Sequence, residues 1–85
     1  MQKVPEIVKE FSSHKVVVKY GDDYLFISTA YQDNGDPTSQ LIETLAFECD
    51  EDGNVKSWHE VAGGPYMTIA DVLTEISRFG FQKRI

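Results

Sequence analysis

The chain contains little cysteine, no long apolar run and few basic residues. Its single cysteine, Cys49, cannot form an internal disulfide, so a reducing, intracellular setting is expected. No apolar stretch approaches the roughly 20 residues that a membrane-spanning helix needs. The first residues, MQKVPEIVKEF, also lack the apolar core of a signal peptide. These absences predict a cytoplasmic protein that does not act in a membrane.

Basic residues are scarcest where acidic residues are densest. The chain carries 14 acidic and 8 basic residues, a formal net charge of −6. Residues 20–62 hold ten of the acids and one base, Lys56. Binding to a nucleic-acid backbone depends on clustered lysine and arginine. We therefore expect no direct contact with nucleic acid.

Sequence patterns of catalysis and metal binding are missing as well. The soft metal ligands His14, Cys49 and His59 lie on separate predicted elements without the spacing of a zinc site. Counting outward from the turn at residues 50–54 pairs Cys49 with Val55, which leaves His59 about 13 Å away, too far to activate the thiol. The same turn alternates acidic and amide side chains, but lacks the glycine and glutamate positions of a calcium loop. These observations predict a protein that is not an enzyme and needs no metal or cofactor.

The chain does contain enough apolar sequence for one modest core. With 85 residues, 41% of them hydrophobic, residues 1–85 are expected to form a single domain. Apolar residues at helical spacing over Pro5–Ser12 predict a short N-terminal helix. Two β-rich runs, Lys15–Tyr20 and Tyr24–Gln32, predict a first hairpin. Asp33–Gln40, rich in turn-forming residues, is predicted to be a loop.

The C-terminal residues define the clearest single element. Thr68 can cap a helix, with Asp71 three residues later in a capping-box arrangement. Gly80 suits the left-handed position that ends a helix. The intervening apolar stripe consists of Ile69, Val72, Leu73, Ile76 and Phe79. Together these signals predict a helix over residues 69–79.

Residues 41–61 are predicted to form a second hairpin. Leu41–Cys49 alternates between two faces, Asp50–Asn54 forms an acidic turn, and Val55–Val61 is the returning strand. Gly63-Gly64-Pro65 is predicted to end that strand, because proline cannot donate to a sheet. The expected fold is α+β: a four-stranded antiparallel meander with a short N-terminal helix and a C-terminal helix, in the order α-β-β-β-β-α.

The second hairpin also carries the only tryptophan and the densest acidity. If Val55 and Val61 face the core, Trp58 lies on the outer face of the strand between Lys56 and Glu60. The alternative is that the N-terminal helix covers that face and buries the ring. An exposed tryptophan is typical of binding hot spots. The candidate protein-binding surface comprises Trp58, Glu60, Lys56, Asp50, Glu51 and Asp52.

Three short motifs, Ile27-Ser28-Thr29, Glu43–Phe47 and Tyr66-Met67-Thr68, resemble those of a known group of proteins. The group consists of small phage and prophage proteins with a V-S-T strand, an E-T-M-x-F strand and a Y-S/T step before a final helix. The similarity spans about residues 24–76. Leu45 stands where the group usually has methionine, and the Gly-His common in its last helix is absent. The resemblance implies a phage origin and supplies no activity.

Taken together, the sequence predicts a small non-enzymatic protein-interaction module whose partner is another protein. With the phage resemblance, that partner would be a host factor. The alternative is an acidic, phosphate-mimicking inhibitor of a nucleic-acid-binding protein. A small enzyme or a metal-binding protein is less favoured, and a homodimer through exposed sheet edges stays open.

Overall fold

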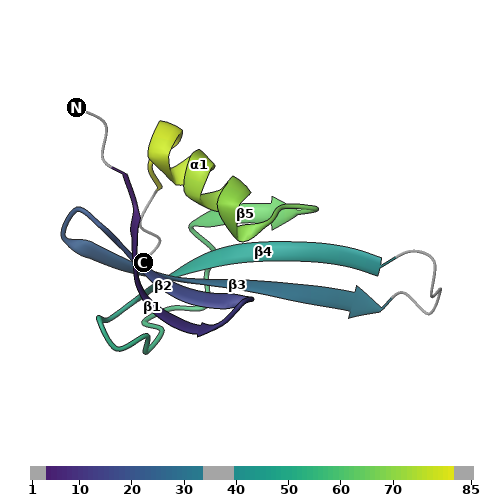
Figure 1. The fold of residues 1–85 in the computed structure, drawn as a ribbon, viewed down its shortest axis with the longest axis horizontal. Helices are drawn as coiled ribbons and strands as arrows, with labels where there is room; N and C mark the ends of the chain where they lie inside the picture. The colour runs from purple at the N-terminus through teal and green to yellow at the C-terminus, as the bar shows by residue number, and fades with distance from the viewer. Residues whose placement is uncertain (1–3, 34–39, 82–85) are drawn as a thin grey trace.

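The computed structural model describes residues 4–33 and 40–81, which form one five-stranded antiparallel sheet and one helix (Figure 1). The strands follow one another across the sheet in chain order. The elements are β1 (Glu6–Ser12), β2 (Lys15–Tyr20), β3 (Asp23–Asp33), β4 (Gln40–Cys49), β5 (Ala62–Pro65) and α1 (Ile69–Phe79). The α+β class is as predicted, but the number of strands and the order of elements are not. The predicted loop lies largely outside the described residues, which omit 34–39.

The predicted N-terminal helix is wrong, because Glu6–Ser12 forms the edge strand β1. A helix of two turns is not stable without a surface to dock on. The strand needs only the turn at Ser13 and His14 to pair with the β-branched strand β2 that follows it. In that turn, the His14 N–H donates to Ser12 Oγ at 3.1 Å. Pairing with the next segment therefore overrides the helical spacing of the apolar residues.

The second hairpin forms at its turn but not along its returning strand. Cys49 forms an isolated bridge with Val55, the pair that counting from the turn predicts. Regular pairing with β4 resumes only where Ala62 lies opposite Ala46. Cys49 and Ala46 are three residues apart on β4, whereas their partners Val55 and Ala62 are seven residues apart. Four residues of the returning chain are therefore looped out. The predicted strand over residues 55–61 is therefore wrong, and we call residues 50–61 the strap.

Strand β5 is formed by the residues that were expected to end a strand. It lies at the sheet edge, where the missing N–H of Pro65 leaves no gap in the sheet. Gly63 is required because a Cβ at this residue would lie 2.1 Å from the Thr44 carbonyl oxygen. The Gly63 N–H donates to Glu75 Oε2 at 2.9 Å, which ties β5 to α1.

Helix α1 covers one face of the sheet and closes the main core (Figure 1). The predicted capping box is confirmed: the Asp71 N–H donates to Thr68 Oγ1, and the Thr68 N–H donates to Asp71 Oδ2. Val72 and Ile76 are fully buried against the sheet, as the apolar stripe predicts. Their partners are Val16, Val18, Leu25, Ile27 and Ala46. Within residues 4–33 and 40–81, no helix is long and apolar enough to cross a membrane.

Candidate binding surface on the helix-free face

The face of the sheet opposite α1 is crossed by the strap (Figure 1). At one end of the strap, Gly53 sits so close to this face that a Cβ would lie 3.0 Å from Phe11 Cζ and 3.1 Å from Val17 Cγ2. At its other end, the Trp58 ring contacts Phe47. The strap therefore closes this face with irregular backbone, where α1 closes the opposite face with a regular helix.

Four aromatic side chains form a row across this face, from β1 to the strap. The Phe11 and Phe26 rings are 6.2 Å apart between centroids, and Phe26 is paired with Phe47 across β3 and β4. The Phe47 and Trp58 rings meet edge to face at 5.0 Å, within the favoured range for aromatic pairs. We call these four residues the aromatic row. Its middle is less exposed than its ends: Phe47 is buried and Phe26 is half-buried, whereas Phe11 is 50% and Trp58 70% exposed.

Phe11 lies on this face because the register shift between Ile7 and Lys9 sets Lys9 opposite Val17, and Phe11 follows Lys9 by two residues on the same side. A second register shift follows between Glu10 and Ser12. Phe11 lies within the shift, with its ring beside Phe26 on the strap side. The Lys9 ammonium lies 5.3 Å from the centre of the Phe11 ring. Sequence analysis missed this residue because its segment was predicted to be helical.

Trp58 is exposed, but not for the reason that alternation suggests. It lies in the looped-out part of the strap and not on a strand. The alternative of burial under an N-terminal helix is wrong, since that helix does not form. One side of the indole rests on Phe47, and 70% of the residue faces water. The ring is thus held in place and still open to contact.

The three acids of the turn differ in what they do. The Asp50 carboxylate accepts hydrogen bonds from the Asp52 N–H, the Asn54 N–H and the Asn54 side-chain amide, at 2.9, 2.9 and 3.0 Å. The Asn54 backbone and side-chain donors lower the pKa of Asp50, because they favour its charged form. Glu51 and Asp52 are exposed. Asp50 therefore shapes the turn, whereas Glu51 and Asp52 present charge to solvent.

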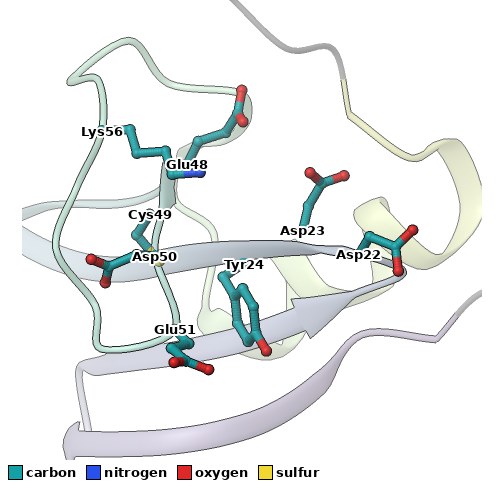
Figure 2. A pocket seen from close by; sticks show the side chains of 8 residues that line it. All are labelled: Asp22, Asp23, Tyr24, Glu48, Cys49, Asp50, Glu51 and Lys56. Carbon is teal, nitrogen blue, oxygen red and sulfur yellow. The ribbon is translucent and has the colours of Figure 1, made fainter.

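A cleft of about 340 Å³ lies where this turn meets the start of β3 (Figure 2). Tyr24 forms part of its wall, and Lys56 is the one base that lines it. Its carboxylates come from Asp22, Asp23, Glu48, Asp50 and Glu51. Figure 2 shows them distributed around the cleft rather than meeting at one point. Across the described parts of the chain, no group of three or more His, Cys, Asp or Glu side chains could hold a metal ion.

Cys49 lies beside this cleft with only 2% of its surface exposed. Burial raises the pKa of its thiol to about 11; the negative charge of Asp50 adds to the rise and Lys56 opposes it. The thiolate is the reactive form of cysteine. A thiol with this pKa is protonated at neutral pH, so Cys49 lacks the activation that a nucleophile needs.

The structure divides the six predicted contact residues between the two ends of the strap. Asp50, Glu51 and Lys56 line the cleft, and Asp52 lies exposed in the same turn, while Trp58 and the exposed Glu60 lie in the looped-out part. The predicted set leaves out the β2–β3 turn and Tyr24, which also line the cleft. The signal was present in the meander order, which pairs Tyr24 with Cys49 and so places that turn beside the end of β4. No protein-family model, curated protein or solved structure matches this chain.

Proposed function

We propose that this chain is a protein-interaction module that binds another protein through the helix-free face, with Trp58 as the central contact. The observation that carries the proposal is the state of this side chain, 70% exposed yet seated on Phe47. Tryptophan is enriched among residues that dominate binding energy. A ring that is already positioned loses less conformational entropy when a partner covers it.

The origin of the partner rests on the resemblance and not on the surface. The motifs over residues 24–76 that resemble small phage and prophage proteins support a host protein as the partner. The chemistry of the surface supports only a partner that covers the Trp58 ring when it binds. These are separate parts of the proposal, and they can fail separately.

A second candidate is the phosphate-mimicking inhibitor. It is favoured by the five carboxylates around the cleft together with the exposed Asp52. Such a protein would hold its target mainly by charge, so its binding would fall steeply with salt. Trp58 would then be dispensable, whereas the proposed module requires it.

Affinity capture from host lysate with three versions of the protein tests both candidates. We expect the wild type and Phe79→Ala to capture the same partner, and Trp58→Ala to lose it. Phe79 is the matched control, because it is an aromatic residue 81% exposed on α1, away from the strap. Circular dichroism and the thermal midpoint would establish that each variant is folded.

The inhibitor gives a different pattern in the same capture. Trp58→Ala would retain the partner, and a double variant, Glu51→Gln with Asp52→Asn, would lose it at moderate salt. Equal capture by Trp58→Ala and the wild type at every salt concentration would refute the interaction module. Capture by none of the versions would refute both candidates for that host.

The predicted homodimer through a sheet edge remains a prediction. Both edges carry features that oppose the addition of another strand. The β1 edge has two register shifts and charged residues such as Lys9 and Glu10, and β5 is four residues long and ends at Pro65. Light scattering of the purified protein over a range of concentrations would decide the question.

A further inference from the structure

The helix-free face combines an apolar contact at Trp58 with an acidic strap, and the lysines on this face, Lys9, Lys15 and Lys19, lie on β1 and β2. The strap carries four acids, Asp50, Glu51, Asp52 and Glu60, against the single base Lys56. Phe47, on which Trp58 rests, and Cys49, beside the cleft, are two residues apart on the same face of β4. That spacing corresponds to about 7 Å along a strand. The Trp58 contact and the acidic cleft are therefore neighbours.

Basic side chains on this face do not reverse the charge at the cleft. The Lys19 ammonium lies 5.8 Å from the centre of the Tyr24 ring, at the border of the cleft. Lys56 lines the cleft itself.

The five carboxylates reach the cleft from both sides of the sheet. Asp23 and Glu48 pair with Tyr20 and Leu25 on the α1 side, whereas Asp50 and Glu51 belong to the strap. Together they still outnumber the two ammonium groups. A positively charged group is therefore drawn to the cleft, and an anionic group is repelled from it.

The acidic turn is also held in a fixed place on the sheet. Gly53 packs closely against Phe11 and Val17: a Cβ at Gly53 would lie 3.0–3.1 Å from their side chains. The Asp50 carboxylate closes the turn through three hydrogen bonds. A turn that is already fixed loses less conformational entropy on binding than a flexible loop would. The turn and the Trp58 ring thus present one preformed surface.

From these features we infer that the occupant of the helix-free face is a basic–apolar segment of another protein: an apolar side chain of the segment packs on Trp58, and a neighbouring arginine or lysine enters the acidic cleft. The inference rests on the proposed function and specifies the chemistry of its partner. In this inference the aromatic contact supplies affinity, and the carboxylates select the charge of the partner.

Synthetic peptides test the two parts of this inference separately. The probe is a fluorescein-labelled ten-residue peptide of alternating arginine and leucine, and its binding is followed by anisotropy at low and at physiological salt. One matched peptide replaces arginine with citrulline, which keeps the shape and removes the charge. The other replaces leucine with serine. We expect binding to fall at least fivefold with either replacement.

The protein variants supply the complementary half of the test. Trp58→Ala should weaken binding of the arginine–leucine peptide by about thirtyfold, the loss at a hot spot of roughly 2 kcal/mol. Glu51→Gln with Asp52→Asn should weaken it by about two- to thirtyfold, the range for two surface ion pairs. Glu10→Gln is the control, because it removes one charge from an exposed position of β1 opposite Val16, on the α1 side of the sheet. Asp50 is left intact because it holds the turn.

Trp58 is the only tryptophan, so its emission reports contact at the proposed position. Unlabelled arginine–leucine peptide should shift that emission to shorter wavelength with the same binding curve. Equal binding of the citrulline peptide, or equal weakening per removed charge by Glu10→Gln, would overturn the inference. If the peptides fail but Trp58→Ala still loses the natural partner in lysate, the inference is overturned and the proposed function stands. A concentration-dependent dimer that buries Trp58 would overturn it in favour of a second copy of this chain.

Discussion

The two faces of the sheet are closed in different ways. On one face, α1 buries Val72 and Ile76 completely against side chains of β2, β3 and β4. On the other, Val17, Phe47 and Cys49 are buried beside the irregular strap, while Phe11 and Trp58 at the ends of the aromatic row are open to solvent. The first face is closed by a regular helix, and the second is closed only in part.

Under the proposed function, this difference assigns most of the stability to the face under α1 and binding to the helix-free face. Burial of apolar side chains under α1 removes them from water completely, which is the main contribution to folding. An exposed ring at the strap contributes little burial free energy in the free protein, and that free energy is gained only when a partner covers the ring. The face under α1 therefore has the larger buried core, and the helix-free face keeps the Phe11 and Trp58 rings exposed.

Substitution of a core residue under α1 should have the largest effect on stability. Ile76→Ala is expected to lower the free energy of unfolding by about 3 kcal/mol, because it leaves a cavity at a fully buried site. Trp58→Ala should lower it by only about 1 kcal/mol, the value of one aromatic pair. Urea unfolding of both variants measures the difference. Equal losses would show that the two faces contribute alike to folding.

A second measurement probes Cys49, which is buried on the helix-free face, through the pH dependence of the unfolding free energy. Because burial raises the pKa of Cys49 from 9.0 to about 11, the unfolded chain loses the thiol proton first as pH rises. The contribution of Cys49 to stability should therefore be complete below pH 9 and fall by about 2–3 kcal/mol as pH approaches 11. The difference in unfolding free energy between the wild type and Cys49→Ala, measured at several pH values, isolates this effect. A difference that does not change with pH would mean that the strap leaves the thiol open to water.

The seating of the strap on the sheet can be tested at Gly53. Gly53→Ala is expected to lower the unfolding free energy by about 1–2 kcal/mol, because φ is +92° and the new Cβ meets Phe11. Gly64→Ala is the matched control, since its Cβ would lie at an ordinary 3.7 Å from Met67 Sδ and its φ is not positive. Thermal unfolding of the two variants gives the comparison. A tolerated Gly53→Ala would show that the turn is not held against the aromatic row.

The start of α1 should contribute less than its buried face. Thr68→Ala removes the side chain that accepts from the Asp71 N–H and should lower the unfolding free energy by about 1 kcal/mol. Thr74→Ala is the control, because the Thr74 hydroxyl donates only to the Ala70 carbonyl within the exposed part of the helix. Chemical denaturation of both would measure the cap. Equal losses of unfolding free energy in the two variants would show that the Thr68 cap does not stabilise α1.

Tyr66 gives the smallest effect and tests whether exposure alone defines a contact. It is 75% exposed like Trp58, but it lies in the turn before α1 and holds a left-handed φ of 62°. Tyr66→Asn should raise the unfolding free energy by up to about 1 kcal/mol, because asparagine tolerates this conformation. Partner capture should be unchanged. Loss of capture would extend the binding surface to the helix side of the molecule.

Local signals were sufficient where one segment determines its own structure. The capping box, the apolar stripe and Gly80 lie within one short stretch, and α1 forms where they predict. The turn at Asp50 is likewise set by its own side chains, and Cys49 pairs with Val55 as counting predicts. In both cases the deciding interactions link residues at most a few positions apart.

Prediction failed where the outcome depended on a neighbouring element. Whether Glu6–Ser12 is helix or strand depends on its pairing with β2, and Gly63 belongs to a strand because the Thr44 carbonyl lies so close. The four looped-out residues of the strap have no sequence signal of their own, since Val55–Val61 alternates as well as many strands do. The candidate surface was therefore named in part, with Trp58 and the acidic turn, while Phe11 and Asp22 were missed.

Acrylamide quenching of the single tryptophan tests the central claim that the strap-covered face is open at Trp58. The measurement compares the native protein with the same protein unfolded in urea. We expect the quenching constant of the native protein to approach that of the unfolded chain, because 70% of Trp58 faces water. A native protein whose tryptophan is strongly shielded from acrylamide would contradict the account and make this face a second core.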